Sequence, residues 1–200
     1  MKKLICVLAA LLMTAGCALA ENVTVPGIRE AMETPTATPS PDAFRFRDGI
    51  RWGMNPQQVK ALESENMTER VLQDWSIMVT AEKVAVSRFT ADLVFMFRQD
   101  RLQMITYEFQ RQDAQTDFLY LTGALCSLYG DKGEADPVAI KNLMDAIYPN
   151  RYRIELITEP CGWVTADGTA VYLYFYSADS FAVMYVSPEL GGGLYQTNGL

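Results

Sequence analysis

The feature that most constrains the fold is a long stretch in which apolar residues occupy every second position. Positions 89, 91, 93, 95 and 97 are all apolar, and the alternation resumes at Ile105, Tyr107 and Phe109. A period of two places alternate side chains on one face of a strand. The pattern therefore predicts an antiparallel hairpin that turns at residues 98–100 and packs its apolar face against helices or a second sheet. The side chains predicted for its solvated face are Arg88, Thr90, Asp92, Gln103, Thr106 and Glu108.

A helix start lies upstream of the hairpin. Asn55 suits an N-cap, Pro56 suits the first helical position, and Gln58 stands where a capping box requires Glu or Gln. Met54 and Val59 occupy the two positions of a hydrophobic staple. These residues predict a helix from position 56 to about position 65 and mark where the folded domain begins.

Two further helices are predicted in the middle of the chain. The first extends from a cap at Asp113 to about Tyr129, where Gly130 occupies the position that commonly ends helices. The second begins at Asp136 and Pro137 and ends before position 149. Both contain apolar residues at spacings of three and four, so each helix is expected to bury one side.

The last third of the chain is rich in strand patterns. Residues 152–156, 161–165, 169–176 and 181–187 each alternate or form short apolar runs, and residues 166–168 form a turn. These runs predict an antiparallel meander. The fold class is thus α+β, with antiparallel sheet packed against two or three helices in the order helix, strands, helices, strands. The alternatives are a single domain over residues 43–190 or two related α/β units at 43–112 and 113–190.

The N-terminus predicts export. A short basic segment, an apolar run over residues 4–13 and Ala18-Leu19-Ala20 together favour a signal peptide over residues 1–20. A competing cut is marked by Ala15-Gly16-Cys17, which is similar to the end of a bacterial lipobox and would lipidate Cys17. Both routes predict an extracytoplasmic protein, and the apolar run is too short to span a membrane. The mature form would have no transmembrane segment, only the lipid anchor if Cys17 is modified.

Two segments are predicted to lie outside the folded domain. Residues 21–42 are rich in Thr and Pro and contain few residues able to form a core, so they favour a disordered spacer. Residues 191–200 are rich in Gly and favour a flexible tail.

Charge and composition exclude several classes of function. Cleavage after Ala20 removes two of the 17 basic side chains and none of the 24 acidic ones, which leaves a net charge of −9. An acidic body argues against nucleic acid as a partner. The chain contains no histidine, which excludes histidine-based triads and most zinc sites. No metal or other cofactor is predicted.

Two cysteines remain in the mature domain. Cys126 and Cys161 enclose about 35 residues, and an exported protein permits a disulfide that would add about 3 kcal/mol of stability. Two buried thiols fit the same residues, because sequence spacing alone does not bring the sulfur atoms together.

An aromatic strand supplies the candidate binding residues. Tyr172, Tyr174 and Tyr176 project to one face of the strand at 169–176 and could form a platform on which sugar rings or peptide side chains stack. Trp163 on the neighbouring strand and Trp52 before the first helix could extend such a surface. The competing interpretation is a central strand that helices cover on both faces, with Trp52 packed under the helix start.

Carboxylates are the remaining candidates for catalysis. An acid/base mechanism needs two of them near one cleft, and the candidates are Glu108, Glu155, Glu159 and Asp167. Their spacing does not pair them, and Asp167 is also explained as a turn residue before Gly168. The sequence therefore favours a protein that is not an enzyme, with a carboxylate-dependent hydrolase of envelope glycans as the alternative.

Residues 52–60 (WGMNPQQVK) carry a resemblance to known exported proteins. The stretch resembles the helix start G-M-[ST]-x-x-[EQ]-V of small α+β modules of the BamE/SmpA type and of the duplicated beta-lactamase inhibitor protein, with Asn55 replacing Ser or Thr. The signal peptide, the spacer and Leu128-Tyr129-Gly130 also resemble uncharacterised exported proteins of Gram-positive gut bacteria. The resemblance implies a non-enzymatic fold that binds proteins or envelope components and transfers no functional residue.

The leading hypothesis is an exported, non-catalytic interaction module of the cell envelope that recognises a protein or an envelope polymer. The alternatives are the carboxylate-dependent hydrolase and an inhibitor or chaperone of a secreted enzyme.

Overall fold

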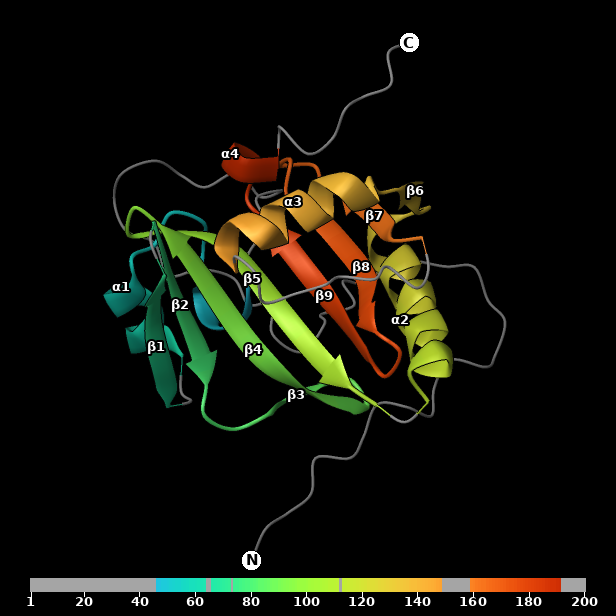
Figure 1. The fold of residues 1–200 in the computed structure, drawn as a ribbon, viewed down its shortest axis with the longest axis horizontal. Coiled ribbons are helices and arrows are strands. Elements are labelled where there is room, and N and C mark those ends of the chain that lie inside the picture. The colour runs from blue at the N-terminus through green and yellow to red at the C-terminus, as the bar shows by residue number, and fades with distance from the viewer. Residues whose placement is uncertain (1–45, 64–65, 73, 112, 149–158, 192–200) are drawn as a thin grey trace, which may run out of the picture.

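A computed structural model describes residues 46–63, 66–72, 74–111, 113–148 and 159–191 of the 200-residue chain. Its centre is one antiparallel sheet of nine strands, so the α+β fold is dominated by strands (Figure 1). The strands are β1 (Met67–Leu72), β2 (Trp75–Thr80), β3 (Val84–Val86), β4 (Phe89–Arg98), β5 (Arg101–Gln110), β6 (Gly133–Glu134), β7 (Cys161–Val164), β8 (Ala170–Ser177) and β9 (Ser180–Val186). The helices are the 3-10 turn η1 (Arg47–Gly49), α1 (Pro56–Leu62), α2 (Ala114–Tyr129), α3 (Pro137–Ile147) and α4 (Pro188–Gly191).

The two halves of the chain share this sheet. Its strand order is β1-β2-β4-β5-β9-β8-β7-β6, and β3 pairs with β4 off this path. The antiparallel pair of β5 and β9 joins residues from the predicted units 43–112 and 113–190. The predicted order of elements is only partly correct, because the short strand β6 separates α2 from α3 and α4 follows the last strand.

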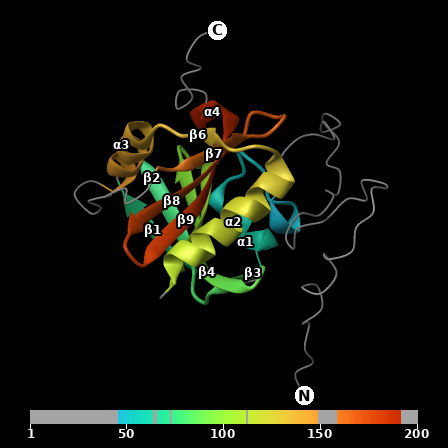
Figure 2. The ribbon, with the colours of Figure 1, turned by 90° about the vertical axis from the view of Figure 1, so that its right-hand side faces the viewer.

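The first apolar core lies between one face of the sheet and the layer formed by α1, α2 and the segment before α1. Odd-numbered residues of β4 and β9, and of β5 from Ile105 onward, point into it, including Phe95, Phe109 and Phe181, and all three are fully buried. Val59 from α1 and Leu121 from α2 pack against them. In Figure 2, α2 crosses in front of this face of the sheet.

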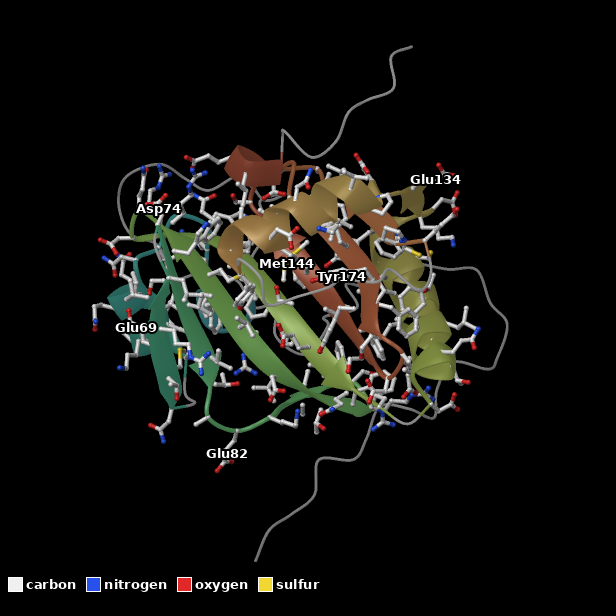
Figure 3. All side chains as sticks on the ribbon, viewed as in Figure 1. Glu69, Asp74, Glu82, Glu134, Met144 and Tyr174 are labelled. Carbon is white, nitrogen blue, oxygen red and sulfur yellow. The ribbon has the colours of Figure 1, made fainter. Side chains whose placement is uncertain are left out.

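The second apolar core lies on the opposite face, beneath α3. Ile140, Met144 and Ile147 of α3 pack against a cluster that includes Tyr172 and Tyr174 of β8. Figure 3 shows Met144 and Tyr174 together where α3 crosses the sheet. The sheet is therefore the middle layer of three.

The predicted helix start is confirmed in detail. Asn55 Oδ1 accepts a hydrogen bond from the Gln58 backbone nitrogen at 2.9 Å, and Asn55 N donates to Gln58 Oε1 at 2.9 Å. Val59 is fully buried and Met54 packs against the same core. The helix ends at Leu62. It is therefore about three residues shorter than predicted, and β1 begins at Met67.

The predicted hairpin is β4–β5, and its turn has a defined geometry. Gln99 and Asp100 both have positive φ angles, 51° and 58°, as a two-residue turn between right-twisted strands requires. The face predicted to be solvated is partly covered, because α3 packs on that side of the sheet. Thr106 is fully buried on this face, and Gln103 is 6% exposed because its side chain binds Ser187 and Glu189, which corrects the prediction for these two residues.

Some of the other predicted elements are confirmed, one is corrected, and the rest lie outside the described residues. The helices at α2 and α3 and the meander β7–β8–β9 are confirmed. Gly191, predicted to open a flexible tail, instead belongs to α4 and is buried. The signal peptide, the spacer, the strand at 152–156 and residues 192–200 lie outside the described residues.

Candidate functional site

The two tryptophans proposed for ligand binding serve the fold. Trp52 Nε1 donates to Thr169 Oγ1 at 2.8 Å and thereby ties the segment before α1 to the start of β8. Trp163 is 3% exposed, and its Nε1 donates to the Gly130 carbonyl at the end of α2 at 3.1 Å. Packing explains both residues, since each indole N–H has a partner within the protein.

The tyrosine platform is not available on the surface. Tyr172 and Tyr174 are 2% and 1% exposed beneath α3, and Tyr176 is half-buried at the edge of the same cluster. The strand lies between β7 and β9, as expected for a central strand covered on both faces. The prediction of a stacking surface is therefore wrong for Tyr172 and Tyr174, because their rings form the core under α3.

Two of the four candidate carboxylates, Asp167 and Glu159, show no sign of a site in the structure. Asp167 Oδ1 accepts from the Thr169 backbone nitrogen at 3.2 Å and from Thr165 Oγ1, so it stabilises the turn before β8. Glu159 is exposed. Glu155 lies outside the described residues. Among the three candidates that the structure describes, Glu108 is the one with a perturbed environment.

Glu108 stands on the α3 side of the sheet, opposite a second carboxylate. Its register partners are Asp92 on β4 and Ala182 on β9. Burial, reinforced by the nearby Asp92 and opposed by Lys83, raises the pKa of Glu108 from 4.5 to about 7. Lys83 Nζ itself binds Asp92 Oδ2 at 2.8 Å. A carboxyl group with such a shifted pKa is a candidate for function.

A buried hydroxyl lies next to Glu108 on the same strand and face. Thr106 is fully buried, and its Oγ1 has no hydrogen-bond partner among the described residues. Residues two apart on a strand lie about 7 Å apart along one face. Glu108 and Thr106 are thus neighbouring polar groups on the α3 side of the sheet. Sequence reasoning found Glu108 but missed Asp92 as its neighbour, although the hairpin register follows from the alternation and the turn at residues 98–101.

The outer face of α2 is a second candidate surface. We define it by its outward positions Gln115, Thr116, Leu119, Tyr120, Gly123 and Ser127. The only charged residue of the 16-residue helix is Asp117, which is 5% exposed. At the chain-wide charged fraction of 20%, a helix of this length would contain about three charged residues. This signal was readable from the sequence and was missed.

Apolar groups dominate the outer face of α2. Leu119 is 65% exposed and Tyr120 is 42% exposed. Ser127 Oγ donates to the Gly123 carbonyl at 2.9 Å, so this outward hydroxyl is already engaged with the helix backbone. In Figure 2 this face of α2 is turned toward the viewer.

Two arginines border the N-terminal half of this face. Arg88 Nη2 and Arg111 Nε bind the two carboxylate oxygens of Asp117 at 3.2 and 2.7 Å. The Arg88 guanidinium also lies 3.9 Å from the Tyr120 ring centroid. Two cations share one buried carboxylate here, and the exposed Asp113 and Asp179 add negative charge at the same end of α2, since Asp113 precedes the helix and the Asp179 carbonyl accepts from Arg111 N.

Both cysteines of the domain are free thiols in this structure. Cys161 is buried in the first core, and Cys126 is half-buried against that core. Lys132 Nζ lies 3.8 Å from Cys161 Sγ.

Within the described ranges, no three His, Cys, Asp or Glu side chains gather in a way that could hold a metal ion. No helix in that part of the chain is long and apolar enough to cross a bilayer.

Together, the sheet, its two helical layers and these surfaces define an α+β module with one polar site and one uncharged helical face. No family model matches the sequence, and neither the curated proteins nor the solved structures include a match.

Proposed function

We propose that this protein is an exported, non-catalytic interaction module of the cell envelope that binds a protein partner through the outer face of α2. The observation that carries the proposal is the complete absence of exposed charge on α2 in a chain of net charge −7. A solvent-facing helix ordinarily places polar and charged residues opposite its apolar stripe. The outer face of α2 has no charged side chain, so no charged group would have to lose its water when a partner covers it.

The composition of the face suits desolvation by a partner. Leu119 and Tyr120 present apolar area, and the Ser127 hydroxyl keeps its hydrogen bond to Gly123 when water leaves. Burying such groups costs little, because no charge and few unpaired polar atoms lose their solvation. Tyr120 is held by its contact with Arg88, so little side-chain freedom is lost on binding.

The bordering arginines specify the chemistry of the partner. The Arg88 and Arg111 side chains are 50% and 42% exposed, so part of each guanidinium group can still donate hydrogen bonds to a partner. The partner is a protein segment with apolar side chains along its centre and a carboxylate at the end that meets the start of α2. A second copy of this acidic chain is disfavoured by charge repulsion.

Export supports the envelope as the location of this interaction. The basic start, the apolar run and the small-residue cleavage pattern of residues 1–20 favour secretion, and Cys17 offers a lipid anchor. The identity of the partner distinguishes a general interaction module from an inhibitor or chaperone, because the last two would bind a secreted enzyme or its folding intermediate.

The test compares two lysine substitutions on protein exported with its own N-terminal segment. Leu119→Lys places a charge on the outer face of α2, and Val138→Lys places one on α3, where Val138 is 61% exposed. A partner should be captured from envelope extract by wild type and Val138→Lys, and its affinity for Leu119→Lys should fall at least about tenfold. Identical capture by all three folded proteins would overturn the proposal, and so would dimerisation lost only in Leu119→Lys.

The second candidate function, a carboxylate-dependent hydrolase, is favoured by one observation. Glu108 and Asp92 are register partners, and the raised pKa of Glu108 suits a general acid. Turnover of envelope glycan fragments by wild type and its loss in both Glu108→Gln and Asp92→Asn would support this function. If the wild-type protein shows no turnover, the hydrolase hypothesis is rejected and the interaction module is the function that remains proposed.

A further inference from the structure

We propose that the outer edge of β1 binds an extended segment of a partner protein, which adds to the sheet as an antiparallel strand. β1 is the last strand at one margin of the sheet, on the left in Figure 1. No other strand or loop of the described residues pairs with its outer edge. α2 packs over β7 and β9 near the other margin, so this edge is separate from the outer face of α2 and the inference does not depend on the proposed function.

The hydrogen-bond register shows which backbone groups of β1 face outward. The Ala81 backbone nitrogen donates to the Asn66 carbonyl at 2.7 Å, and these two residues continue the pairing of β1 with β2. Hydrogen-bonded and non-hydrogen-bonded pairs alternate along an antiparallel ladder, so the even-numbered residues of β1 bond to β2. The N–H and C=O groups that point away from β2 belong to Met67, Glu69 and Val71.

An incoming strand can reach this edge, because neither helical layer covers the middle of β1. The four residues from Thr68 to Val71 are all exposed, although they alternate between the two faces of the strand. Val71 is 73% exposed. All six residues of β1 pair in unbroken register with β2, and the strand contains no proline. The opposite margin of the sheet, β6, offers only two residues. A long, regular and exposed edge is the kind that accepts a further strand.

The side chains of β1 specify the partner segment. Glu69 lies opposite Met78 of the first core, so Glu69 and Val71 project to the α2 side of the sheet. Arg70 lies opposite Ile77 of the second core and projects to the α3 side. Opposite charges on directly opposed residues stabilise an antiparallel pair, and like charges destabilise it. The segment that fits therefore has, from its N-terminal to its C-terminal end, an apolar, an acidic and a basic residue opposite Val71, Arg70 and Glu69.

A second copy of this chain fits the edge less well. Two-fold symmetric pairing of β1 with itself keeps each residue on its own face of the sheet. In the two registers that overlap the strand most fully, either Glu69 or Arg70 faces its own copy. Both arrangements oppose like charges, and the acidic net charge of the chain adds to the repulsion.

Nuclear magnetic resonance of the exported full chain with three matched peptides tests this site. The parent hexapeptide TVEKTI, acetylated and amidated at its ends, places valine, glutamate and lysine opposite Val71, Arg70 and Glu69. It should shift the amide signals of β1 in a saturable way. Exchanging its glutamate and lysine should weaken binding about fivefold. Methylating the backbone nitrogens of its valine and lysine should abolish binding, because these N–H groups donate to the outward carbonyls of β1.

Two substitutions at one position separate backbone pairing from side-chain contact. Val71→Pro removes an outward N–H that β2 does not use, and it should weaken binding of the parent peptide at least about tenfold. Val71→Thr keeps that N–H and should bind within about twofold of wild type. Leu119→Lys on α2 should bind as wild type does, so failure of this inference is distinguishable from failure of the proposed function. If Val71→Pro does not fold, the methylated peptide on wild type still decides the result.

Four results would overturn the proposal. The first is no saturable shift with the parent peptide, and the second is equal binding of the parent and methylated peptides. The third is a set of saturable shifts located on α2 instead of β1. The fourth is slow hydrogen exchange of the Met67, Glu69 and Val71 amides in the free chain, because another segment or a second copy would then already occupy the edge. Protection that rises with protein concentration would identify the second copy.

Discussion

Asp92 and Glu108 stand opposite each other in the β4–β5 hairpin, but among the residues that the structure describes only Asp92 has a bound cation, since Lys83 Nζ lies 2.8 Å from its Oδ2. The same face of the sheet therefore carries Asp92, whose charge is compensated by Lys83, and Glu108, which has no ion-pair partner among the described residues. Burial and the neighbouring Asp92 hold the pKa of Glu108 at about 7, above its ordinary value of 4.5.

The first prediction concerns the pH dependence of stability. A group whose pKa is higher in the folded state stabilises that state below pH 4.5, and this contribution is lost as pH rises toward 7. Ionised Glu108 therefore lowers the free energy of unfolding by up to about 3 kcal/mol above pH 7. Urea unfolding should show Glu108→Gln to be more stable than wild type at pH 8 and similar to it at pH 4.5. Glu82→Gln, an exposed control, should show no such difference, and a Glu108→Gln effect that is equal at both pH values would contradict the assignment.

The second prediction concerns Asp117, the buried carboxylate in the first turn of α2. Asp117→Asn removes the charge that holds Arg88 and Arg111, and we expect a loss of about 2 kcal/mol in denaturant unfolding. The cost stays below that of a fully buried pair because both guanidinium groups are partly solvated. Asp145→Asn breaks the exposed pair with Lys141 and should cost less than about 0.5 kcal/mol. Equal effects of the two substitutions would show that the Asp117 cluster is not structural.

The third prediction concerns the start of α1. Asn55→Ala removes the acceptor for the Gln58 backbone nitrogen and should lower the free energy of unfolding by about 1 kcal/mol. Asn55→Ser keeps an N-cap oxygen and should retain most of that stability. If Asn55→Ala abolished partner binding without changing the melting temperature, the stretch around Trp52 would instead be part of a binding site.

The fourth prediction concerns the two thiols. Cys126 is half-buried and Cys161 is 4% exposed, so a maleimide reagent should modify Cys126 in the native protein and Cys161 only after unfolding. Mass spectrometry of the form cleaved after Ala20 would count the adducts. Failure of both thiols to react in denaturant, with recovery after reduction, would show that the two cysteines form a disulfide in the exported protein.

The candidate sites were only partly predictable. The strand pattern identified Glu108 as one of several carboxylates, but its special environment depends on burial beside Asp92 and on Lys83 being engaged elsewhere. Tyr174, in contrast, was predicted as a binding residue and lies in the core. Its aromatic strand fits either a binding surface or a core, and the packing of α3 decided for the core.

Local physical chemistry determined several elements of this protein from the sequence alone. The cap at Asn55, the alternation in β4 and β5 and the helix end at Gly130 depend on residues close together in the chain, and the structure contains each of them. The tertiary structure decided which faces are covered. The pairing of β5 with β9 and the docking of α2 and α3 on opposite faces join residues far apart in sequence. The burial of Glu108 beside Asp92, and with it the raised pKa of Glu108, follows from long-range contacts and has no local sequence signal.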